Sequence, residues 1–243
     1  MAILQVLNLG RTEYKSCWEL QKRAFDLRST GLIPDTLLLT EHDHVYTIGK
    51  SGNDNHLLAH EQELRAKGIS VFHNDRGGDI TYHGPGQLVG YPILDLKDHY
   101  LDLHRYLRDL EEVIIRTLAA YGIDGKRVEE YTGVWVGDEK ICAIGVKSSR
   151  WITMHGFAFN VNTDLSLFDR IIPCGIFEKG VTSLRQVLYQ ETDFMIAQET
   201  VVNEFAHVFG CDVKRETSGD LAALSVDDPN GEGALSTVNQ HES

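Results

Sequence analysis

The tripeptide Pro173-Cys174-Gly175 places a thiol in a turn-forming sequence, 34 residues after Lys140. A thiolate attacks a thioester and forms another thioester, but a free thiol with a pKa of about 8.5 is mostly protonated at neutral pH. A nearby ammonium group lowers that pKa, and Lys140 is the candidate for this role and for a proton shuttle. We therefore predict that Cys174 is a nucleophile rather than a small buried residue.

The other three cysteines are expected to be structural. Cys17 and Cys211 lie in helix and strand patterns, while Cys142 follows Lys140 by two residues and is expected on the same strand face. Cys142 is therefore kept as an alternative nucleophile. The four cysteines form no C-x-x-C pair and the N-terminus lacks the features of a signal peptide, so we expect reduced thiols in the cytoplasm.

A glycine-rich segment, residues 76–87, reads Arg-Gly-Gly-Asp-Ile-Thr-Tyr-His-Gly-Pro-Gly-Gln. Glycine lets a backbone approach a ligand closely, so this segment suits the wall of a pocket for an acyl chain or a carrier arm. It matches neither the phosphate-binding nor the dinucleotide-binding glycine pattern. A plain hairpin is the alternative, but Arg76, Tyr82 and His83 within the segment favour a site.

Two further patterns carry weaker signals. His42-Asp43-His44 resembles a metal-binding tract, but no convincing third ligand lies nearby, so no metal is expected. Aromatic residues are expected in the core, with Phe157 as a candidate to face an acyl chain; they are Trp18, Trp135, Trp151, Phe157 and Phe159.

The composition excludes several classes of protein. The formal net charge of −13 over 243 residues argues against nucleic-acid binding, which needs clustered basic residues. No window approaches eighteen consecutive apolar residues, so no membrane span is expected. Residues 140–185 carry six basic and three acidic side chains, so this segment is locally positive.

Helical and extended patterns alternate along the chain and predict one mixed α/β (α+β) domain, with a mixed sheet flanked by helices. Helices are expected at 12–30 with Thr12 as its cap, 61–67, 101–121 and 193–209. Strands are expected at 1–9, 36–40, 45–48, 69–73, 88–96, 133–136, 140–148, 151–161 and 211–214. Pro92 suggests an edge strand or a bend, and Gly137-Asp138 suggests a hairpin turn. We expect a catalytic domain at 1–215 and an acidic flexible tail at 216–243.

Four segments, taken in order, resemble the lipoyl(octanoyl) transferases over roughly residues 5–190. They are residues 76–87, Lys-Ile-Cys-Ala-Ile-Gly at 140–145, His-Gly-Phe-Ala-Phe-Asn at 155–160 and Ile-Pro-Cys-Gly-Ile at 172–176. The resemblance implies a single domain like the catalytic domain of biotin and lipoate protein ligases. Cys142 is a departure, because a small apolar residue such as alanine is expected there.

The resemblance also implies roles for residues. Cys174 matches the acyl-thioester nucleophile of the family, and Lys140 matches the residue that lowers its pKa. The matching substrate-binding positions are Arg76, Gly77, Gly78, Asp79, Ile80, Thr81, Tyr82, His83, Ala143, Ile144, Gly145, Gly156, Phe157 and Ala158.

The implied activity is transfer of an octanoyl or lipoyl group from acyl carrier protein to a lysine of lipoyl domains, without a cofactor. The implied acceptors are the lipoyl domains of 2-oxoacid dehydrogenase complexes and the glycine cleavage H protein. Two alternatives are an ATP-dependent lipoate- or biotin-type ligase and a non-catalytic carrier-binding protein. The first needs an adenylate site and no cysteine nucleophile, and the second does not need Lys140 and Cys174 together.

Overall fold

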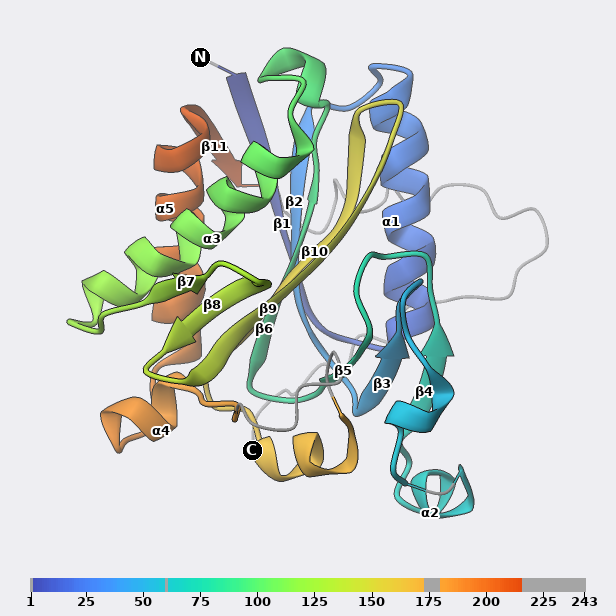
Figure 1. Cartoon of the computed structure of the whole chain (residues 1–243). Helices are drawn as coiled ribbons and strands as arrows, with labels where there is room; N and C mark the ends of the chain where they lie inside the picture. Colours follow the sequence, from blue (N-terminus) through green and yellow to red (C-terminus); the bar gives the residue numbers. More distant parts are fainter. Residues whose placement is uncertain (1, 60, 173–179, 216–243) are drawn as a thin grey trace, which may run out of the picture.

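Figure 1 shows the computed structural model of the chain, which describes residues 2–59, 61–172 and 180–215. Eight strands in these ranges form a mixed sheet in the order β11–β1–β2–β6–β10–β9–β8–β7. Their bounds are Ala2–Thr12 (β1), Asp35–His42 (β2), Gln87–Ile93 (β6), Lys126–Val128 (β7), Tyr131–Val136 (β8), Glu139–Ser149 (β9), Ile152–Asn160 (β10) and Cys211–Arg215 (β11). β1 runs parallel to β2 and β11, and the other neighbours are antiparallel.

A smaller sheet has the order β4–β3–β5, and helices lie on both faces of the large sheet (Figure 1). The small sheet comprises Val45–Ile48 (β3), Ser70–His73 (β4) and Ile80–His83 (β5). The helices are Tyr14–Ser29 (α1), Glu61–Ala66 (α2), Leu103–Ala120 (α3), Leu184–Leu188 (α4) and Phe194–Phe209 (α5). This arrangement confirms the predicted mixed sheet flanked by helices. None of the helices in the described part is long and apolar enough to cross a bilayer.

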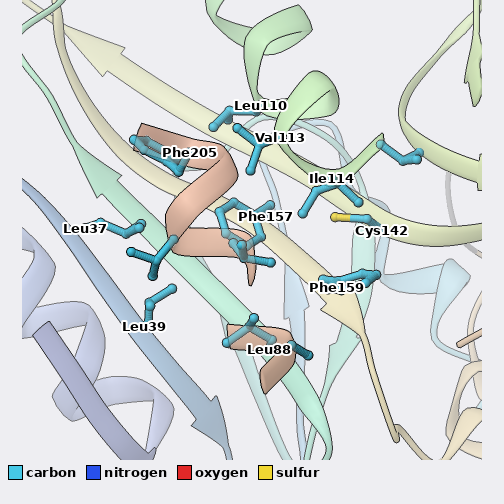
Figure 2. Close-up of a cluster of buried hydrophobic side chains, with 14 of the residues drawn as sticks. Leu37, Leu39, Leu88, Leu110, Val113, Ile114, Cys142, Phe157, Phe159 and Phe205 are labelled. Atoms are coloured by element: carbon cyan, nitrogen blue, oxygen red, sulfur yellow. The ribbon is translucent and has the colours of Figure 1, made fainter. Parts of the chain in front are cut away.

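The strand β2 shows how the sheet separates two cores. Leu37 and Leu39 pack in a cluster with α3 and α5, whereas Leu38 packs in the cluster on the α1 side. Side chains alternate between the faces of a strand, so one run of leucines serves both cores. Figure 2 shows the first cluster, in which Phe157 and Phe205 lie between β2 and α3.

Helix ends agree with the sequence patterns except at the first helix. The cap of α1 is Glu13 rather than Thr12, because its carboxylate accepts hydrogen bonds from the backbone N–H groups of the first turn, while Thr12 ends β1. Asp193 caps α5 in the usual way, and Gly210 ends that helix with a φ of 63°.

Of the two alternatives predicted for Pro92, an edge strand or a bend, the edge strand is wrong, because β6 is central in the sheet. Pro92 pairs with Leu37 of β2, but the ladder to β10 extends only from Gln87 to Gly90. Proline has no backbone N–H to donate, and Pro92 lies beyond the point where the regular pairing of β6 with β10 has stopped. Its carbonyl oxygen instead accepts a hydrogen bond from Thr153 Oγ1 at 2.7 Å.

The two long strands β9 and β10 are joined by a tight turn at Arg150 and Trp151. Both residues have positive φ, 54° and 71°, as in the hairpin turn that follows the natural twist of the strands. Trp151 is 37% exposed, so the prediction that it belongs to the core is wrong. The predicted turn at Gly137-Asp138 between β8 and β9 is confirmed. The strands β5 and β7 and the helix α4 were not predicted.

Candidate active site

A cavity of about 480 Å³ lies between residues 76–83, the strands β9 and β10, and the first turns of α3. This volume is within the roughly 300–1,000 Å³ typical of small-molecule pockets. Fourteen of the predicted site residues line it: Arg76, Gly77, Gly78, Asp79, Ile80, Thr81, His83, Lys140, Ala143, Ile144, Gly145, Gly156, Phe157 and Ala158. The structure thus brings together three segments that are far apart in the sequence.

Tyr82 is the exception among the predicted binding residues. Its side chain is fully buried against Tyr46 and Phe168, and its hydroxyl lies 2.7 Å from His44 Nδ1. It therefore helps to attach the small sheet and does not line the cavity. Its partner His44 belongs to the tract considered as a metal site, and His42 of the same tract lies 2.6 Å from the hydroxyl of Tyr91.

Glycines let the loop at residues 76–78 lie directly on two other backbones. A Cβ at Gly49 would be 2.4 Å from the carbonyl oxygen of Gly78, and one at Gly145 would be 2.8 Å from that of Gly77. The N–H of Gly77 donates to the carbonyl oxygen of Val146 at 2.9 Å, which fixes the loop against β9. Any larger residue at these positions forces the loop away from the cavity wall.

Backbone carbonyl groups orient the guanidinium group of Arg76. Its Nη2 donates to Thr47 O at 2.7 Å and to Thr47 Oγ1 at 3.0 Å, and Nη1 donates to Gly77 O. The side chain is only 8% exposed, so this positive charge is held inside the wall of the cavity.

Four buried tyrosine and histidine side chains are part of the cavity wall: Tyr14, His83, Tyr91 and His155. Burial lowers the pKa of His83 to about 3 and that of His155 to about 4, so both imidazoles are neutral at neutral pH. Burial raises the pKa of Tyr14 to about 12. These side chains therefore offer uncharged hydrogen-bonding groups to the cavity.

The carboxylate of Asp75 hydrogen-bonds to His155 and to Lys147. Burial alone would raise the pKa of its carboxyl group, but hydrogen bonds from Lys147 at 2.5 Å and with His155 at 2.8 Å lower it to about 2. His155 has a positive φ of 60°, which a residue other than glycine adopts only under constraint. The sequence reasoning missed Asp75, although it directly precedes Arg76. It also missed Tyr14 and Tyr91, for which the sequence carries no signal.

Lys140 lines the cavity on β9, where its ammonium group lies 4.8 Å from the centre of the Trp135 ring. Its backbone pairs with the chain that follows residue 179: the N–H of Lys140 donates to Gly180 O, and its carbonyl oxygen accepts from the N–H of Thr182. Gly133 on β8 lets this strand lie close to β9, since a Cβ there would lie 2.7 Å from the carbonyl oxygen of Cys142. Cys174 lies outside the described residues.

Cys142 does not share the face of Lys140, contrary to the expectation from their spacing. Trp135 pairs with Lys140 and Val134 pairs with Cys142, so Ile141 is an extra residue on β9, as in a β-bulge. The bulge shifts Cys142 into the cluster of Figure 2, where it is fully buried. Burial raises the pKa of its thiol far above the usual value, which makes it unsuitable as a nucleophile.

Comparison with known proteins decides the family. Residues 13–206 match the lipoyl protein ligase A/B catalytic domain. The chain belongs to this family. It is 58% identical over 212 residues to an octanoyltransferase from Rubrobacter xylanophilus, covering 86% of this chain and 95% of that one. An octanoyltransferase from Flavobacterium johnsoniae is 49% identical, with 86% and 98% of the chains covered.

Solved structures share the fold of this chain at low sequence identity. A lipoate protein ligase from Thermoplasma acidophilum with bound lipoic acid superposes with a TM-score of 0.70 at 15% identity, over 91% of this chain and 92% of that one. A biotin protein ligase from Aquifex aeolicus gives a TM-score of 0.54 at 15% identity, over 85% and 70%. The predicted likeness to biotin and lipoate ligase domains is thereby confirmed.

Proposed function

We propose that this chain transfers an octanoyl group from acyl carrier protein to a lysine of a lipoyl domain through a thioester on Cys174. The acyltransferase class and the octanoyl group follow from relatives that are 49–58% identical over most of the chain. The family supports lipoyl domains as acceptors. The carrier protein as donor, and 2-oxoacid dehydrogenase complexes and the glycine cleavage H protein as sources of the acceptor, are part of the proposal.

The observation that carries the proposal is the position of Lys140. Its side chain lines the glycine-walled cavity, and its backbone pairs with Gly180, six residues after Cys174. An ammonium group at this place is suited to lower the pKa of a thiol carried by the neighbouring segment. Ile144 and Phe157 offer apolar surface to an acyl chain.

The proposed reaction has two steps. The Cys174 thiolate attacks the octanoyl thioester, the new C–S bond forms, and the carrier thiolate leaves and takes up a proton. The neutral amine of the acceptor lysine then attacks the enzyme thioester, an amide bond forms, and Cys174 leaves as a thiolate. In the first step the Lys140 ammonium group stabilises the Cys174 thiolate and donates the proton that the carrier thiolate takes up. In the second step the neutral Lys140 amine accepts the proton that the attacking lysine loses, and the ammonium group so formed stabilises the departing Cys174 thiolate.

A transfer assay separates this function from its alternatives. We expect octanoylation of a purified lipoyl domain from octanoyl carrier protein in the absence of nucleotide and magnesium. Free octanoate with ATP and magnesium is expected to give no product, whereas a ligase would use that mixture alone. A lack of product from both donors would indicate a non-catalytic binding protein.

A further inference from the structure

Two buried side-chain amides bridge the strands β6 and β10, and neighbouring carbonyl groups fix their orientation. Asn160 Nδ2 donates to Thr182 O at 3.0 Å, and Gln87 Nε2 donates to Tyr82 O at 3.2 Å. If either amide were flipped, two oxygen acceptors would face each other. In this orientation Gln87 Nε2 also donates to Asn160 Oδ1 at 2.9 Å.

The orientation of Gln87 determines the tautomer of His83. Gln87 Oε1 lies 2.8 Å from His83 Nδ1, so that nitrogen must carry the proton. His83 Nε2 is then an acceptor, 3.3 Å from the hydroxyl of Thr47. That hydroxyl in turn accepts from Arg76 Nη2. In the series Arg76, Thr47, His83, Gln87 and Asn160, each side chain therefore donates a hydrogen bond to the next one.

The other end of the series reaches the strand of Lys140. Thr182, whose carbonyl oxygen accepts from Asn160, donates its N–H to the carbonyl oxygen of Lys140 at 3.0 Å. The side chains that connect the two ends are almost fully buried: Thr47 is 0%, His83 6%, Gln87 1% and Asn160 4% exposed. Hydrogen bonds aligned head to tail in such surroundings strengthen one another.

We infer that Thr47, Gln87 and Asn160 are positioning residues, which connect Arg76 to the backbone of Lys140 through one directional series of hydrogen bonds. The series holds His83 as the neutral Nδ1–H tautomer. It also fixes the position of the cavity wall at Arg76 relative to the wall at Lys140. Its role in catalysis rests on the function proposed above for Lys140, but the tautomer of His83 does not.

The tautomer is measured by long-range ¹H–¹⁵N correlation spectra of the full chain labelled with ¹⁵N-histidine. The signals of His83 are assigned by their loss in His83→Gln. We expect the pattern of a neutral imidazole protonated at Nδ1, unchanged from about pH 5.5 to about pH 8. A ring protonated at Nε2, or one that titrates in this range, would overturn the inference, even if octanoyl transfer were absent in the wild type.

Positioning is tested by two matched pairs of variants in the transfer assay. Thr47→Val removes the hydroxyl and should lower kcat about tenfold with the KM for carrier protein nearly unchanged, whereas Thr47→Ser keeps the bond and should stay within about twofold. Asn160→Leu should also lower kcat. Its control is Asn162→Leu, because the side chain of Asn162 hydrogen-bonds to the backbone of Thr192 and not, within the described residues, to a member of this series. Equal losses within either pair, or a loss in KM alone, would contradict a positioning role.

Discussion

At the scale of single residues, the site depends on which groups are charged and which are withheld from solvent. Lys140 and Arg76 place positive charge at the cavity, while His83 and His155 remain neutral because they are buried. Uncharged polar side chains and an ammonium group within one cavity suit a reaction in which a thiolate is formed next to an apolar acyl chain.

The cysteines should differ sharply in reactivity. Burial raises the pKa of Cys17 to about 12 and that of Cys142 even further, and both side chains are almost fully buried. We expect iodoacetamide at neutral pH to leave both thiols unmodified in the folded protein and to modify them after unfolding. Peptide mass spectrometry at several times reads out each site. Modification of Cys142 at the rate of a free thiol in the folded protein would restore it as a candidate nucleophile.

At the scale of elements, the buried Glu111 of α3 attaches this helix to β7 and β8. Its Oε1 accepts from the N–H of Gly133 at 3.0 Å, and its Oε2 accepts from Arg108 and Arg127 at 2.7 and 3.2 Å. The sequence pattern that predicted this helix did not indicate a buried carboxylate.

Replacing this carboxylate should be costly. Glu111→Ala leaves Gly133 N–H and part of two guanidinium groups without an acceptor, so we expect a loss of about 3–5 kcal/mol in the free energy of unfolding. Glu112→Ala removes an exposed pair with Arg127 and should cost at most about 1 kcal/mol. Urea unfolding measures both variants. A cost for Glu111→Ala no larger than that for Glu112→Ala would show that the attachment is not important.

The sequence predicted elements well where local chemistry decides them. Gly31 and Gly210 end helices with positive φ, and the Gly137-Asp138 turn joins two strands as expected. The failures arise from tertiary contacts. The β-bulge at Ile141 reverses the face of Cys142, and Pro92 fits into a central strand because the regular pairing of β6 with β10 ends at Gly90.

In the candidate site, too, the residues marked by local sequence were predicted and those decided by tertiary packing were not. The motif segments indicated which residues line the cavity, because glycine-rich and chemically unusual runs are visible without a structure. Tyr82 could not be assigned correctly, since only the packing of the small sheet shows that its ring turns toward Phe168. Tyr14 and Tyr91 come from a helix start and a central strand, and nothing in their local sequence sets them apart.

At the scale of the whole molecule, buried histidines should make the fold sensitive to acid. Burial lowers the pKa of His42 and His155 to about 4 and that of His83 to about 3, whereas unfolded histidine titrates near 6.5. The unfolded state therefore binds protons below pH 6.5 that the native state does not, and stability falls as the pH drops toward 4. Each group contributes up to about 1.4 kcal/mol per pH unit in this window.

Urea unfolding between about pH 7.5 and 4.5 tests this dependence. The urea concentration at the unfolding midpoint should decrease as the pH is lowered below 6.5. In His42→Asn this decrease with pH should be smaller. An unfolding midpoint that stays constant down to pH 5 would mean that these histidines are protonated in the native state.

The division of the chain into a domain at 1–215 and a tail at 216–243 remains a proposal. The family match ends at residue 206, and β11 ends at Arg215. Removing residues 217–243 should therefore leave the melting temperature and the transfer rate nearly unchanged. A loss of several degrees would assign the C-terminal segment a role in the folded domain.

The most direct test of the central claim is the mass of the intact protein after mixing with octanoyl carrier protein and no acceptor, followed by peptide mapping. The account predicts a gain of one octanoyl group on Cys174, lost on addition of a lipoyl domain. The adduct should be absent in Cys174→Ala, retained in Cys142→Ala, and slower to form in Lys140→Ala. Transfer at a normal rate by Cys174→Ala, or an adduct mapped to another residue, would contradict it.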